Sequence, residues 1–425
     1  MTITNATTSS SAYQFSFKPT SALLGLQNLF IAFGALVLVP ILTGLDPCVA
    51  LFTAGLGTLI FQVITKGQIP IFLGSSFAFI APTIYGVQNW GISGTLCGLA
   101  SSGVVYLLLS MLVRLRGRNW LLKVFPPIIT GPIIMSIGLI LAPVAAHMAM
   151  GQTGDGATQL FPESQALTVA FIALAATFLT RAFGRGVMSL VPILTGIIVG
   201  YIAAYFCGMV DLSVVQAAPY WQIPKFVTPT WNWEAILFIM PVALVTTIEH
   251  VGDVVAISTI TGKDYLKNPG LDKTLLGDGI ASTVAACLGG PPNTTYAEVT
   301  AGVAMTRAFN PANMTWAAFF AVALAFNAKI GVFLQTIPTP VMGGVLMLLF
   351  GTIAVIGLNI LVEAKEDLLE PRAMMVAAII LVIPVSGIIF KVGQVDLSGI
   401  ALAAIVGIIL NLLLQPRKPN LAASV

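Results

Sequence analysis

Three carboxylates could do chemistry inside an otherwise apolar sequence. Glu249 and Asp253 are four residues apart, so on a helix they share one face, and Glu298 lies in a later apolar segment. A carboxylate at the centre of a bilayer costs about 3 kcal/mol on insertion scales, so such residues face a cavity or a partner. Because two nearby carboxylates repel at low dielectric, one of them is expected to hold a proton. These residues therefore predict a proton-coupling site.

A polar-polar-aromatic triplet occurs twice, as Ser75–Phe77 and as Thr294–Tyr296, each time after Gly and Pro residues that interrupt a helix. Irregular backbone at membrane depth is tolerated where it lines a cavity, and paired broken segments point to a transport site. Free N–H groups at a following half-helix, near Ala297, can donate to a ligand. Together with Glu298 and the two aromatic rings, they suit a flat, neutral, amide-like molecule.

Other interpretations of these residues stay open. Glu249 and Glu298 could instead be a buried pair that bridges helices, and Asp253 could serve only to orient Glu249 or to cap a polar network. His250 adjoins Glu249 but points about 100° away on a helix, which favours a packing role behind the site. Asp278, between two glycines, either joins the polar network or lies near the cytoplasmic surface.

The composition places these residues in a membrane protein. The chain of 425 residues is 57% hydrophobic and 8% charged, with a mean hydropathy of +0.97, whereas soluble domains carry about 25% charged residues. The net charge of +3 forms no basic cluster, which argues against nucleic-acid binding. With two His and no HExxH, GxSxG or Walker pattern, we expect no metal, no cofactor and no enzyme activity. Four isolated cysteines indicate packing residues: Cys48, Cys97, Cys207 and Cys287.

Apolar runs of about 20 residues predict fourteen membrane spans. Seven lie in the first half: 22–43, 47–65, 70–86, 92–113, 126–147, 166–184 and 187–207. Seven lie in the second half: 233–258, 275–289, 290–306, 312–334, 340–360, 372–390 and 396–415. All 19 Lys and Arg residues except Lys225, Lys329 and Lys391 then fall on the side of both termini, which is therefore cytoplasmic. Residues 1–20 lack the features of a signal peptide and are expected to be a short, mobile cytoplasmic tail.

An odd number of spans per half means that any repeat between the halves is inverted. Besides the two triplets, three residues of the fifth span recur at one constant offset in the twelfth. These are Pro127, Gly131 and Gly138, repeated as Pro340, Gly344 and Gly351. The sequence thus predicts an all-α polytopic membrane protein with two inverted seven-span repeats.

At these residues the chain resembles the nucleobase-ascorbate transporter family, and within it the bacterial uracil permeases. The resemblance covers essentially the whole chain and is strongest at Gly74–Phe79, Glu249–Gly252 and Pro292–Tyr296. It implies seven plus seven inverted spans, with short strands in spans three and ten. The implied core domain comprises residues 21–113 and 208–335, and the implied gate domain comprises 114–207 and 336–425.

The resemblance also implies roles for the site residues. Glu249 and Glu298 would bind the base, with Phe77, Tyr296 and Ala297 forming the rest of the site. Family members are proton symporters, commonly homodimers, in the lipid of the inner membrane. The chain departs from the family pattern after Glu298, where the family usually has Asn next and Gly two places later but this chain reads Val299-Thr300-Ala301-Gly302. It also departs in span one, where Asn28 replaces a common His.

The expected function is import of uracil with protons by alternating access. Asp253, Glu249 and Glu298 are the candidate proton sites. The alternatives are a xanthine or uric acid carrier of the same family, and an anion exchanger or channel of related fold. Three carboxylates would repel an anionic substrate. Sodium coupling also stays open, because oxygen ligands could hold a hard cation.

Overall fold

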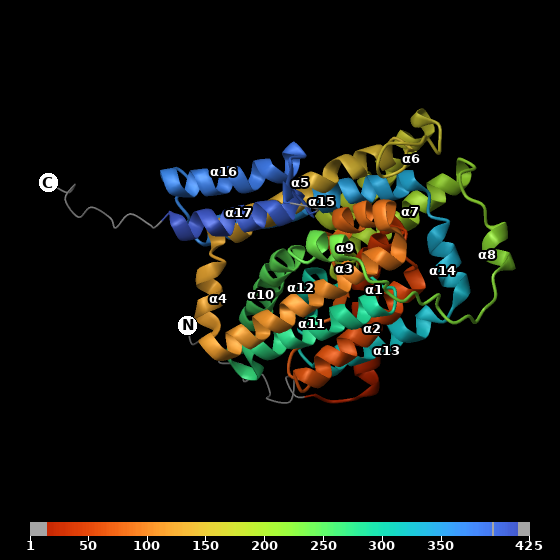
Figure 1. Cartoon of the computed structure of the whole chain (residues 1–425). Helices are drawn as coiled ribbons and strands as arrows, with labels where there is room; N and C mark the ends of the chain where they lie inside the picture. Colours follow the sequence, from red (N-terminus) through yellow and green to blue (C-terminus); the bar gives the residue numbers. More distant parts are fainter. Residues whose placement is uncertain (1–14, 393–394, 415–425) are drawn as a thin grey trace, which may run out of the picture.

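The computed structural model describes residues 15–392 and 395–414 and is built almost entirely of helices (Figure 1). The elements of the first half are α1 (Pro19–Thr43), α2 (Pro47–Ile64), β1 (Leu73–Ser75), η2 (Phe77–Phe79), α3 (Ile80–Arg116), α4 (Arg118–Val124), α5 (Pro127–Ala149), α6 (Glu163–Phe183), η3 (Gly186–Leu190), α7 (Pro192–Phe206) and α8 (Ser213–Ala217). The elements of the second half are α9 (Trp233–Ile239), α10 (Val242–Thr261), η4 (Leu266–Gly270), α11 (Leu271–Cys287), β2 (Asn293–Thr295), α12 (Ala297–Thr306), α13 (Ala312–Ala325), α14 (Ala328–Gln335), α15 (Thr339–Glu363), α16 (Pro371–Ser386), β3 (Ile389–Val392), β4 (Val395–Ser398) and α17 (Gly399–Leu413).

Within the described residues, seven helices are long and apolar enough to cross a membrane, and the bent pair α13 and α14 would make an eighth. The chain is therefore a multi-pass membrane protein. The expected fourteen spans stay a prediction, because several predicted spans are merged or short here. Spans 70–86 and 92–113 meet in one helical run that is broken at Gly91, whose φ of 68° and ψ of 175° suit glycine. Spans 275–289 and 290–306 fall on α11, β2 and α12, none of which reaches the length of a span by itself.

The two predicted short strands are present and pair with each other. β1 and β2 run antiparallel, with Leu73 opposite Thr295 and Ser75 opposite Asn293. Each strand is followed at once by a helix, η2 and α3 after β1 and α12 after β2. The strand pair therefore brings the first turns of two half-helices to one place in the interior.

Figure 1 shows two groups of helices packed against each other. In the lower group, α11 packs on α2 and α3, and α13 packs on α1 and α2. In the upper group, α15 packs along α5, α6 and α7, and α16 packs on α5 and α17. The strand pair contacts α1, α2, α10 and α11, so it belongs to the lower group.

Small residues allow the closest helix contacts of the upper group, as is usual for helices in membranes. A Cβ on Gly138 would lie 2.3 Å from the carbonyl oxygen of Phe350 in α15, and one on Gly344 would lie 2.1 Å from that of Ala170 in α6. Gly351, by contrast, has no such neighbour within 4 Å. The glycines that match in sequence therefore do not all have matching surroundings.

Two segments differ from the prediction. The single span expected at 312–334 is bent by 82° between α13 and α14, where the side chain of Asn327 caps α14 by accepting from the Ile330 N–H. The expected tail at 1–20 ends earlier than predicted, since α1 begins at Pro19. Before it, Phe17 stacks on Trp316 with 4.4 Å between ring centroids. Residues 1–14 of this tail, and the chain beyond residue 414, lie outside the described residues.

Candidate functional site

The strand pair is held in place by polar side chains from neighbouring helices. Thr58 of α2 accepts from the Leu73 N–H at 2.9 Å, and Asn293 donates through Nδ2 to the Thr53 carbonyl of α2 at 2.9 Å. Ser282 of α11 donates to the Asn293 carbonyl at 2.7 Å. A buried backbone group without a partner costs free energy, so these contacts make non-helical backbone tolerable in the interior.

The two aromatic residues of the triplets are packed rather than free. Tyr296 is 2% exposed and donates from its hydroxyl to the Ser75 carbonyl at 2.9 Å. A Cβ on Gly74 would lie 2.5 Å from the Tyr296 ring, so glycine at this position lets the ring rest on β1. Phe77 is also buried, at the start of η2. Both rings are therefore packed in the protein interior in this conformation.

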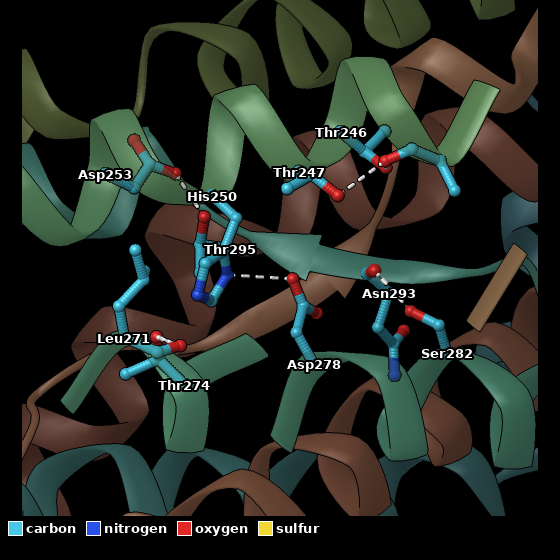
Figure 2. A network of polar contacts seen from close by, with 11 residues as sticks. Thr246, Thr247, His250, Asp253, Leu271, Thr274, Asp278, Ser282, Asn293 and Thr295 are labelled. Atoms are coloured by element: carbon cyan, nitrogen blue, oxygen red, sulfur yellow. Dashed lines mark hydrogen bonds and ion pairs between the residues drawn. The ribbon is translucent and has the colours of Figure 1, made fainter. Parts of the chain in front are cut away.

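The three carboxylates come together beside the strand pair, from α10 and from the first turn of α12. Glu249 and Glu298 are half-buried, whereas Asp253 is 8% exposed. Figure 2 shows Asp253 pointing at Thr295 of β2, whose hydroxyl donates to it at 2.5 Å. Thr295, which donates to Asp253, lies three residues before Glu298, and α10 packs on α12, so the three side chains share one region of the interior. Ionised carboxylates that lie near one another in a poorly solvated interior repel one another.

A second polar pair lies behind these carboxylates. His250 and Asp278 are both fully buried, and Nδ1 of His250 lies 2.9 Å from Oδ2 of Asp278, which links α10 to α11 (Figure 2). The rings of Phe61 and Tyr106 contact the His250 ring edge-on from two sides. Asp278 is therefore an interior residue of the polar network, which decides between the two positions left open by the sequence. The pairing itself was missed, because nothing in the local sequence connects the two residues.

A cavity of about 230 Å³ reaches this site from one side. It lies between the two groups of helices, and its wall includes Ala297 and Glu298 of α12 and Ile31 of α1 on one side and Arg181 of α6 on the other. The predicted site residues Glu249, Asp253, Phe77 and Tyr296 are not part of this wall. Arg181 was not predicted as a site residue, because a basic residue near a span end was counted only toward topology.

Other parts of the described chain offer less for small-molecule chemistry. A hollow of about 460 Å³ lies among loop residues that include Lys66 and Asp264, and it contains none of the predicted site residues. Among the described residues, no group of three or more His, Cys, Asp or Glu side chains could hold a metal ion. The polar interior around the strand pair is therefore the candidate functional site.

Permeases with similar sequences match nearly the whole chain. A family model described as "Permease family" matches residues 19–392. The chain is 51% identical over 395 residues to a probable uracil permease of Haemophilus influenzae, covering 93% of this chain and 94% of the relative. It is 44% identical over 406 residues to the uracil permease of Bacillus caldolyticus, with 94% and 93% covered, and 40% identical over 392 residues to that of Escherichia coli, with 92% and 90% covered.

Solved structures share the fold at much lower identity. The transmembrane domain of the cyanobacterium bicarbonate transporter BicA superposes with a TM-score of 0.67 at 14% identity, covering 94% of this chain and 98% of that one. The murine anion transporter Slc26a9 in its inward-facing state superposes with a TM-score of 0.68 at 12% identity, with 95% and 69% covered. Together, the match to the family model and the identity to named permeases over more than nine tenths of the sequence show that this chain belongs to the permease family of nucleobase-ascorbate transporters.

Proposed function

We propose that this protein imports uracil together with protons across the inner membrane by alternating access. The observation that carries the proposal is the convergence of Glu249, Asp253 and Glu298 beside two half-helix starts in an apolar interior. The names of relatives that are 40–51% identical to this chain supply the substrate. Uracil has N–H edges for carboxylates and C=O edges for backbone N–H groups, which is the chemistry that this site offers.

Each predicted site residue takes a specific role in this proposal. Glu249 is the main ligand of the base and Glu298 the second, and both are half-buried and therefore reachable. Phe77, Tyr296 and Ala297 form the wall against which the base lies. Asp253 shares the proton with Glu249 and Glu298, which makes the three carboxylates one coupled proton site. Each proton that enters contributes about 2.3 kcal/mol per 100 mV of membrane potential.

We assign residues 21–113 and 208–335 to a core domain that carries the site, and residues 114–207 and 336–425 to a gate domain. The two packed groups of helices support this division. Fourteen spans in two inverted repeats, with both termini cytoplasmic, remain part of the proposal, and the antiparallel pairing of β1 with β2 supports it. We also propose that the protein works as a homodimer embedded in lipid.

An anion exchanger is the second candidate, because the solved structures that share this fold include bicarbonate and anion transporters. Several carboxylates at one site argue against it, since their charge repels an anion. A xanthine or uric acid carrier would use the same site and differs only in the shape of the base.

Uptake of labelled uracil into proteoliposomes under an inward proton gradient, without sodium, tests the proposal. We expect uptake that an uncoupler abolishes and that Glu249→Gln reduces at least tenfold, since one lost charge-assisted hydrogen bond is worth about 1.5–3 kcal/mol. Glu163→Gln, at the start of α6 and away from the site, is the matched control and should retain uptake. If uracil is not taken up but xanthine or bicarbonate is transported, the proposal that uracil is the substrate would be refuted. A strict sodium requirement would refute the proton coupling.

A further inference from the structure

The hollow of about 460 Å³ outside the proposed transport site is lined by two basic side chains. Lys66 comes from the turn between α2 and β1, and Lys263 comes from the loop between α10 and η4. The side-chain amides of Gln68 and Asn268 line the same hollow. Ammonium and amide N–H groups donate hydrogen bonds to an anion, and the volume is that of a pocket for a small molecule.

The acidic side chain in the wall of the hollow does not cancel these two charges. Among the described residues that line the hollow, Asp264 is the acidic one. Its carboxylate is paired with Arg118 of α4, whose Nη1 lies 3.2 Å from Oδ2 and 3.3 Å from Oδ1. The pair carries no net charge, so the two lysines leave the hollow positive.

The backbone around Lys66 makes a tight turn that places this lysine at the hollow. Lys66 and Gly67 have φ values of 56° and 60°, and the Gln68 N–H donates to the Thr65 carbonyl at 3.3 Å. Gly, Asn and Asp are the residues favoured in this left-handed conformation, so a lysine here is uncommon. An unusual residue in a strained turn at a pocket suggests a function for its side chain.

Two further observations point to a separate anionic molecule. Burial lowers the pKa of the Lys263 ammonium, so this charge has lost part of its water and gains from an anionic partner. Phe15 forms part of the wall, but the chain before it supplies no negative charge, because residues 1–14 contain no Asp or Glu.

We propose that this hollow binds a phosphate group, of a soluble molecule or of a lipid, through Lys66 and Lys263. A phosphate monoester carries up to two negative charges and has several acceptor oxygens, so it can engage two ammonium groups at once. The turn holding Lys66 leads into β1, and the loop holding Lys263 follows α10, which carries Glu249. A bound phosphate thus joins two segments of the proposed core on the side that we propose to be cytoplasmic.

Equilibrium dialysis with radiolabelled inorganic phosphate tests the site on the full-length protein, in an uncharged detergent at low ionic strength. We expect Lys66→Gln and Lys263→Gln each to weaken binding about tenfold or more, the usual effect of losing a hydrogen bond between charged groups. Lys66→Arg and Lys263→Arg should retain most of the affinity. Lys267→Gln is the matched control and should bind normally, because Lys267 is exposed in the same connection but does not line the hollow.

Nanodiscs distinguish a lipid headgroup from a soluble phosphate. One set contains phosphatidylcholine alone, and the other also contains phosphatidylglycerol. If detergent-solubilised protein does not bind inorganic phosphate, but phosphatidylglycerol raises the unfolding temperature of the wild type and not of the Lys66→Gln, Lys263→Gln double variant, the ligand is a lipid. If neither dialysis nor nanodiscs separate the double variant from Lys267→Gln, the inference is overturned. Neither measurement uses uracil, so the outcome is independent of the proposed transport.

Discussion

The hydroxyl of Thr295 and the carboxylate of Asp253 make one of the shortest polar contacts of the site, at 2.5 Å. The bond ties β2 to α10 and occupies one oxygen of the carboxylate. Glu249, one helical turn earlier, has no comparable hydrogen bond among the described contacts and is half-buried. The two acidic residues on one helix face therefore differ in their contacts: Asp253 is held by Thr295, whereas Glu249 is half-buried and has no such hydrogen bond among the described residues.

Replacing Thr295 by Val removes this donor from a buried carboxylate without changing the size of the side chain. We expect the free energy of unfolding to fall by about 1.5–3 kcal/mol, the usual contribution of a hydrogen bond to a charged group. Thr295→Ser keeps the hydroxyl and should lose much less. Thermal unfolding of the purified protein in detergent compares the two, and a larger loss for Thr295→Ser than for Thr295→Val would show that the methyl group, and not the hydrogen bond, is what matters.

The buried pair of His250 and Asp278 should respond strongly to loss of one partner. Asp278→Ala leaves His250 enclosed by aromatic rings without its acid, and breaking a buried pair costs about 3–5 kcal/mol. Replacing both by apolar residues of similar size, His250→Phe with Asp278→Leu, should cost less than Asp278→Ala alone. Unfolding temperatures in detergent test this order, and a double variant that is the less stable of the two would contradict it.

At the scale of secondary structure, the sequence predicted those elements whose cause is local. Gly74, and the glycine and proline run before Asn293, predicted interrupted helices, and the two strands that the resemblance implied lie at these interruptions. The bend after Ala325 has a weaker local signal, one Asn that can cap a helix, and was missed. The contact of His250 with Asp278 and the place of Arg181 in the cavity depend on packing between distant segments, which residue spacing does not encode.

The glycines of α5 and α15 test how far the internal repeat extends. Gly138→Ala would place a Cβ 2.3 Å from the Phe350 carbonyl, so we expect the two helices to separate and the protein to lose about 1–3 kcal/mol of stability. Gly351→Ala, at the matching position of the repeat, meets no atom within 4 Å and should be neutral or stabilising. Expression level and unfolding temperature of the two variants test this difference. An equal loss of stability at both positions would contradict this packing.

At the scale of the whole molecule, the distribution of basic residues predicts which loops face the cytoplasm. In a background without exposed cysteines, Lys225→Cys should react with an impermeant thiol reagent added to intact cells. Lys267→Cys, in the loop between α10 and α11, should react only after the membrane is permeabilised. Both positions are exposed, so reactivity reports the side of the membrane and not burial. The reverse pattern would invert the proposed topology.

The segment before α1 is fastened to α13 and its preceding loop. The side-chain amide of Asn310 accepts from the Ser16 N–H and donates to the Ser16 carbonyl, while Phe17 stacks on Trp316. The beginning of the described chain thus moves with the proposed core, whereas α17 at the other end packs on α5 and α16 of the proposed gate. Dyes attached at exposed Lys18 and Leu413 would then form a molecular ruler, whose energy-transfer efficiency follows the carrier through each turnover.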